Sequence, residues 1–146
     1  MTMITYIGFN FPLKISENDV EDDAEYNLEN EFDYDYPYEE QRNIVKQKHF
    51  TTPYIYQIIQ YANPIWTLTD YEKVNSLHNY EKSKKTFLNL CNSLKELLPE
   101  GDFCEIYICW DGEEKEKHEV ELKINLNDLQ IEAIEIYEKC FIRVEN

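Results

Sequence analysis

The sequence predicts an α+β fold, with an antiparallel sheet and helices packed on one face, in a single domain spanning residues 1–146. Three observations lead to this prediction. The last third of the chain contains several apolar segments of strand length, and the middle contains a long segment with helical periodicity. The chain has 146 residues, 42% of them hydrophobic, which is enough for one core and too few for two ordinary domains.

Four segments have the pattern of strands. Residues 4–14 alternate, with Pro12 near the end of the segment. Residues 103–110, FCEIYICW, are apolar on both faces apart from one glutamate, which is typical of an interior strand. Residues 119–126 alternate between apolar and charged side chains, and residues 134–144 form the last predicted strand. These segments supply the predicted sheet.

The clearest predicted helix covers residues 70–98, with a possible break near Asn79. Thr69 and Glu72 have the spacing of a capping box, in which the first side chain caps the helix. The apolar stripe that follows consists of Tyr80, Phe87, Leu88, Cys91, Leu94, Leu97 and Leu98. Pro99 and Gly101 end the helix.

Two further segments are assigned less uniquely. A second helix is predicted from Pro37 to about residue 48, with acids near its start and lysines near its end, as the helix dipole favours. Residues 51–62 suit a helix beginning near Thr52 and a strand equally well, because the segment combines a proline start with many β-branched and aromatic residues. The sequence leaves this choice open.

The charge of the chain is concentrated in residues 17–40. This acidic-aromatic segment holds twelve of the 30 acids, and no Lys or Arg occurs between Lys14 and Arg42. Apolar residues at steps of four predict an acidic helix over about 17–30. A general need for solubility would spread the charge more evenly along the chain.

Residues 32–38 change to a period of two. This period places Phe32, Tyr34, Tyr36 and Tyr38 on one face of an extended segment and Asp33 and Asp35 on the other. Aromatic rings are typical of interface cores, and carboxylates attract basic partners. The candidate partner-binding residues are therefore Glu29, Glu31, Asp33, Tyr34, Asp35, Tyr36, Tyr38, Glu39 and Glu40.

Composition narrows the class of partner. The formal net charge of −16 disfavours direct binding of nucleic acid or of an anionic membrane, and favours a basic protein. No apolar stretch approaches the roughly 20 residues needed to span a bilayer, and the start of the chain has no signal-peptide pattern. The four cysteines lie in apolar runs without a C-x-x-C pair, which predicts reduced thiols in a cytoplasmic protein.

Catalytic, metal and cofactor patterns are weak. His118 lies among glutamates without the ligand spacing of a zinc or calcium site, and the three glycines are too scattered for a phosphate-binding loop. A hairpin of residues 104–110 with 119–126 would bring Cys109 near His118, but the sequence offers no orienting group or oxyanion donors. The sequence thus predicts no metal, no cofactor and no enzyme.

The leading hypothesis is an intracellular inhibitor, such as an immunity protein or antitoxin, that neutralises a basic toxin, nuclease or defence enzyme. One alternative is a phage-type DNA mimic, which requires residues 17–40 to be wholly helical to approach the charge density of a DNA strand. The other alternative is a small enzyme that uses Cys109 and His118.

Overall fold

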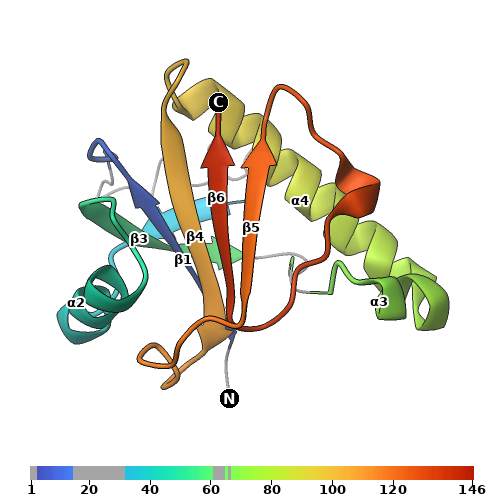
Figure 1. Ribbon diagram of the computed structural model, residues 1–146, viewed down its shortest axis with the longest axis horizontal. Coiled ribbons are helices and arrows are strands. Elements are labelled where there is room, and N and C mark those ends of the chain that lie inside the picture. Colours follow the sequence, from blue (N-terminus) through green and yellow to red (C-terminus); the bar gives the residue numbers. More distant parts are fainter. Residues whose placement is uncertain (1–2, 15–31, 61–64, 66) are drawn as a thin grey trace, which may run out of the picture.

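The computed structural model describes residues 3–14, 32–60, 65 and 67–146, which form a six-stranded sheet with helices (Figure 1). The strands are β1 (Met3–Phe9), β2 (Phe32–Asp35), β3 (Tyr54–Gln60), β4 (Phe103–Trp110), β5 (Val120–Asn125) and β6 (Cys140–Glu145). The helices are α2 (Glu39–Lys48), α3 (Asp70–Asn75), α4 (Leu77–Leu97) and the short 3-10 helix η1 (Ile131–Ala133). The predicted α+β class is confirmed, and the predicted helix over 17–30 lies outside the described residues.

The sheet has the strand order β2-β3-β1-β4-β6-β5. Each neighbouring pair is antiparallel except β5 and β6, which are parallel. The register aligns one apolar row across the sheet, formed by Tyr56, Ile7, Ile106, Ile142 and Leu122. All five side chains belong to or pack against the larger of two hydrophobic clusters, so this face of the sheet forms the main core.

Helix α4 covers the main core, and Figure 1 shows it crossing behind β6 and β5. Its buried core side chains are Tyr80, Phe87, Leu90, Cys91 and Leu94. The predicted cap is confirmed, because the Glu72 backbone N–H donates to Thr69 Oγ1 at 3.2 Å. The predicted long helix is divided into α3 and α4 at Ser76, close to the predicted break.

Helix α2 lies on the opposite face of the sheet. Its one buried residue, Val45, packs in the second cluster, together with Tyr6, Phe50, Ile55, Tyr107 and Cys109. The helices therefore cover both faces, whereas the sequence led us to expect one. The physical reason is the alternation of β1 and β4: their central residues are apolar or aromatic on both sides, so each face requires cover.

The strand at residues 119–126 does not form a hairpin with β4. Gly112 adopts a positive φ of 97° in a turn, as a Gly at this position favours, but the chain then continues to the far edge of the sheet. There β5 pairs in parallel with β6, and Val120 lies opposite Cys140. A turn residue fixes local backbone direction only, and the pairing partner depends on distant parts of the chain.

Other strand boundaries also differ from the sequence expectation. The first strand ends at Phe9, and the predicted strand over 134–144 begins only at Cys140, after Lys139 with a φ of 54°. Ile136 is nevertheless buried, and its backbone N–H donates to the Leu68 carbonyl at 2.8 Å. The ambiguous segment 51–62 contains strand β3.

The structure also bears on two further expectations, those about the cysteines and about membrane-spanning segments. All four cysteines fall in the described ranges, and each is a buried free thiol. Within those same ranges, the structure has no helix that is long and apolar enough to cross a bilayer.

Candidate partner-binding surface

The described part of the predicted site runs from β2 into the first turn of α2. We call it the acidic surface, and it comprises Asp33, Tyr34, Asp35, Tyr36, Tyr38, Glu39 and Glu40. Asp33 is half-buried, and the carboxylates of Asp35, Glu39 and Glu40 are exposed. Among the residues that the structure describes, no ion pair joins these four acids to a Lys or Arg. Their negative charge is therefore uncompensated there. The other two predicted residues, Glu29 and Glu31, lie outside the described residues.

The three tyrosines of the acidic surface differ in burial. Tyr34 is half-buried and meets Phe9 edge-to-face, with ring centroids 6.1 Å apart. Tyr36 is 46% exposed, and its ring packs on Tyr56 at a centroid distance of 5.5 Å. Tyr38 is 84% exposed. Two of the rings are thus anchored on the body of the protein, and the third projects into solvent.

The difference among the tyrosines follows from where β2 ends. Alternation of side chains holds only while the backbone stays extended, and β2 ends at Asp35, whose side chain accepts the Tyr36 backbone N–H at 2.8 Å. Pro37 is buried, and Tyr38 becomes the N-cap residue of α2. The expected common face for Tyr34, Tyr36 and Tyr38 therefore exists for the first two rings only.

Helix α2 has an asymmetric charge distribution. Glu39 and Glu40 lie in the first turn, and Lys46 and Lys48 lie in the last, so each end is complementary to the helix dipole. A tyrosine at the N-cap supplies no side-chain hydrogen bond to the free backbone N–H groups. The two glutamates in the first turn offset that lack electrostatically, which gives them a structural role beside any role in binding.

A buried glutamate fixes the loop between α2 and β3. Glu105 is 3% exposed, and its Oε1 accepts the backbone N–H groups of Thr51 at 2.8 Å and Thr52 at 2.7 Å. The Thr51 hydroxyl donates to the same oxygen at 3.0 Å. Gly8 makes this close approach possible, because a Cβ at that position would lie 2.0 Å from Thr52 Oγ1. The loop that follows the C-terminal end of α2 is thus held against strand β4.

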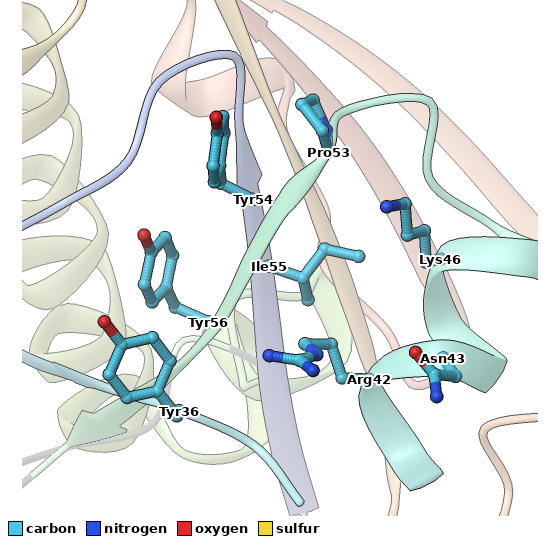
Figure 2. Close-up of a pocket in the computed structure, with 8 residues that line it drawn as sticks. All are labelled: Tyr36, Arg42, Asn43, Lys46, Pro53, Tyr54, Ile55 and Tyr56. Atoms are coloured by element: carbon cyan, nitrogen blue, oxygen red, sulfur yellow. The ribbon is translucent and has the colours of Figure 1, made fainter. Parts of the chain in front are cut away.

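A recess of about 170 Å³ lies next to the acidic surface. Its lining consists of Tyr36, Arg42, Asn43, Lys46, Pro53, Tyr54, Ile55 and Tyr56. Figure 2 shows the three tyrosines on one side of β3 and the α2 residues on the other, with Ile55 pointing toward α2. Sequence reasoning missed the recess. The spacing of Arg42 and Lys46, four residues apart on a helix, was its one available sign.

The alternative catalytic pair was Cys109 and His118. The surroundings of Cys109 disfavour the thiolate that a nucleophilic cysteine needs. Cys109 is fully buried, and burial raises the pKa of its thiol far above the ordinary value, with nearby carboxylates adding to the effect. The reactive thiolate is therefore disfavoured. The His118 ring nitrogens contact His49 and Glu121.

His49 links α2 to the segment that follows β4. Its Nε2 donates to the Glu114 carbonyl at 2.8 Å, and its Nδ1 lies 3.2 Å from His118 Nδ1. The ring stacks on Tyr107 with centroids 3.8 Å apart. Burial lowers the pKa of His49, and the charge of His118 also lowers it, although the hydrogen bond to Glu114 acts in the opposite direction. A neutral His49 ring fits this geometry.

In the part of the chain that the structure describes, no group of three or more His, Cys, Asp or Glu side chains is arranged to hold a metal ion. Comparison with known proteins supplies no family: no protein-family model matches this chain, and no curated protein or solved structure matches it.

Proposed function

We propose that this protein is an inhibitor that binds and neutralises a basic protein through its acidic surface, in the manner of an immunity protein or antitoxin. The observation that carries the proposal is the set of four acids, Asp33, Asp35, Glu39 and Glu40, without an internal cationic partner in the described ranges. Uncompensated surface charge speeds encounter with a partner of opposite charge.

The anchored rings support the same proposal. Tyr34 and Tyr36 rest on Phe9 and Tyr56, so they lose little conformational freedom on binding. The exposed Tyr38 offers a large aromatic contact with a polar tip, a combination that is enriched at interfaces. Carboxylates would set the rate and orientation of encounter, and the tyrosines would supply buried contact area.

The proposed partner is a basic toxin, nuclease or defence enzyme inside the same cell. A cytoplasmic location is part of the proposal, and the four free, buried cysteines support it because free thiols persist in reducing compartments. The proposal assigns the chain no reaction.

The test uses two variants that each lose four negative charges. The site variant replaces Asp33 and Asp35 with Asn and Glu39 and Glu40 with Gln. The control variant neutralises four exposed acids elsewhere, by the substitutions Glu81→Gln, Glu96→Gln, Glu100→Gln and Asp111→Asn. Immobilised wild type and control variant should retain the same basic protein from cell extract at low salt, and the site variant should lose it. Equal retention by all three proteins would reject the acidic surface as the binding site.

The complex with the retained basic protein can also be used to distinguish this proposal from DNA mimicry. A mimic occupies the DNA-binding groove of its target and competes with duplex DNA, whereas an inhibitor that binds elsewhere allows a ternary complex with DNA. Addition of a short duplex to the purified complex, followed by native gel electrophoresis, distinguishes these two modes.

A further inference from the structure

Three polar side chains form a continuous chain of contacts between the end of α2 and the start of β5. His49 is the C-cap residue of α2, and its Nδ1 lies 3.2 Å from Nδ1 of His118. The other ring nitrogen of His118, Nε2, contacts a carboxylate oxygen of Glu121 in β5. The other ring nitrogen of His49, Nε2, lies 2.8 Å from the Glu114 carbonyl. Contacts of two histidine rings thus join α2, the segment after β4, and β5.

Aromatic rings hold both histidines in place. His49 stacks on Tyr107 of β4 with ring centroids 3.8 Å apart, and His118 stacks on Phe141 of β6 at 5.3 Å. His118 also meets Tyr107 edge-on at 6.5 Å, and both histidines are half-buried. This packing limits how far either ring can turn away from the other.

The number of hydrogens on the two rings follows from their partners. A carbonyl and a carboxylate only accept, so Nε2 of His49 and Nε2 of His118 must both donate. If both rings are neutral, the two facing Nδ1 atoms are then bare, and two acceptors form no hydrogen bond. If both rings are charged, two N–H groups face each other. All contacts are satisfied only when three hydrogens are shared among the four ring nitrogens, which gives the pair one positive charge.

The surrounding charges favour His118 as the positive ring. Burial lowers the pKa of His49, and the charges of His118 and Lys48 also lower it, although the hydrogen bond to Glu114 acts in the opposite direction. The carboxylate of Glu121 lies on the His118 side of the pair. In the closed arrangement, neutral His49 therefore accepts a hydrogen bond from charged His118.

The other titratable groups around the pair have hydrogen-bond partners of their own. Burial raises the pKa of Tyr107, and its hydroxyl donates to a backbone carbonyl at 3.2 Å. Glu114 offers its carbonyl to His49, whereas its carboxylate accepts the Tyr6 hydroxyl at 3.2 Å and the Gly112 backbone N–H at 3.0 Å. The exchangeable proton thus belongs to the two histidines.

We propose that His49, His118 and Glu121 form a proton-dependent clasp between the end of α2 and the start of β5. The clasp is closed when the two rings hold three hydrogens on their four nitrogens. With two hydrogens, the pair loses its Nδ1 contact or releases Glu121, and with four hydrogens the two facing N–H groups repel. The clasp therefore couples this junction to pH. This proposal is independent of the proposed inhibitor function.

The experiment uses the full chain with ¹⁵N-labelled histidine, over about pH 5 to 9. Long-range ¹H–¹⁵N spectra count the hydrogens on the ring nitrogens, with the exposed His78 as the reference for a ring in water. Nuclear Overhauser effects from the His118 ring to His49 and to Glu121 report the two contacts. We expect both contacts at full strength while the pair holds three hydrogens. With two or with four, at least one contact should lose half or more of its intensity.

Two variants that lose the same charge separate the clasp from a general effect of charge. In Glu121→Gln, the amide can accept from His118 Nε2–H or donate to bare Nε2, so both contacts should persist when the pair holds two hydrogens. Glu119→Gln removes a neighbouring exposed acid and should lose a contact on the alkaline side, as wild type does. The ring contact of Phe9 with Tyr34 reports in each case that the fold is intact.

The proposal fails on any one of three results. The first is that wild type keeps both contacts at full strength whatever the number of hydrogens on the pair. The second is that Glu121→Gln loses a contact on the alkaline side as wild type does. The third is that Glu119→Gln keeps both contacts there, which would assign the effect to total charge.

Discussion

At the scale of single residues, Gly8 is the position where one added carbon has the clearest cost. A Cβ there would lie 2.0 Å from Thr52 Oγ1 and 2.9 Å from Phe50 Cδ2. Both neighbours belong to the loop that Glu105 holds against β4, so they have little freedom to move away. The requirement for glycine arises from this close approach, because no positive φ is involved.

We predict that Gly8→Ala lowers the free energy of unfolding by about 1–3 kcal/mol, the usual cost of overpacking a core. Urea denaturation measures the change. Thr52→Ala removes the closest clashing atom, so in the Gly8→Ala background it should restore part of the loss. Equal stability of Gly8→Ala and wild type would show that the loop moves freely.

His49 gives the stability of the protein a defined dependence on pH. The folded state lowers the pKa of His49, chiefly through burial, and the nearby charges of His118 and Lys48 act in the same direction. The unfolded chain therefore binds a proton more readily than the folded chain. The contribution of neutral His49 is present above the unfolded pKa of about 6.5 and decreases as pH falls below that value.

We predict that wild type loses stability more steeply than His49→Gln as pH falls from about 7.5 to about 5.5. Urea denaturation at each pH measures the two curves. The carboxylates titrate in both proteins, so the difference between the curves isolates His49. Parallel curves for the two proteins would contradict the lowered pKa.

At the scale of elements, the capping signal in the sequence was reliable, whereas strand boundaries and strand pairing were not fully predictable. The capping residue Thr69 and the start of α3 follow from residues within one turn of each other. The partner of β5 depends on a strand 20 residues away, and the turn at Gly112 gives no information about it. Within the ambiguous segment, the strand Tyr54–Gln60 was likewise decided by pairing with β1 and β2.

We predict that loss of the Thr69 hydroxyl costs about 1 kcal/mol of unfolding free energy. Its Oγ1 accepts the Glu72 backbone N–H, and that N–H has no partner within α3. Thr69→Val keeps the size of the side chain and removes the cap, whereas Thr69→Ser keeps the cap and removes a methyl group. Thermal or urea denaturation should therefore rank Thr69→Ser above Thr69→Val, and the reverse order would contradict a capping role.

The candidate site was only partly predictable from the sequence. The concentration of acid and the anchoring of Tyr34 and Tyr36 follow from composition and from a period of two. The exposure of Tyr38 does not, because the backbone turns at Pro37 and the period ends. The recess could not be predicted, because it combines residues of α2 with the part of β3 that does not pair with β2.

At the scale of the whole molecule, the net charge of −16 bears on the proposed encounter with a basic partner. Such a charge keeps molecules of the same kind apart and draws basic proteins from a distance of about one Debye length, near 8 Å at physiological salt. The acidic surface adds direction to this attraction, and the recess with Arg42 and Lys46 provides one place of opposite sign.

The most direct test of the central claim is the association rate constant for the basic protein that the wild-type chain retains. Stopped-flow measurements at low salt, with wild type, the site variant at Asp33, Asp35, Glu39 and Glu40, and the control variant of equal net charge, provide that comparison. We predict that the site variant associates several-fold more slowly than the control, and that added salt removes most of the difference. Equal rate constants for the two variants would contradict a role for the acidic surface in binding.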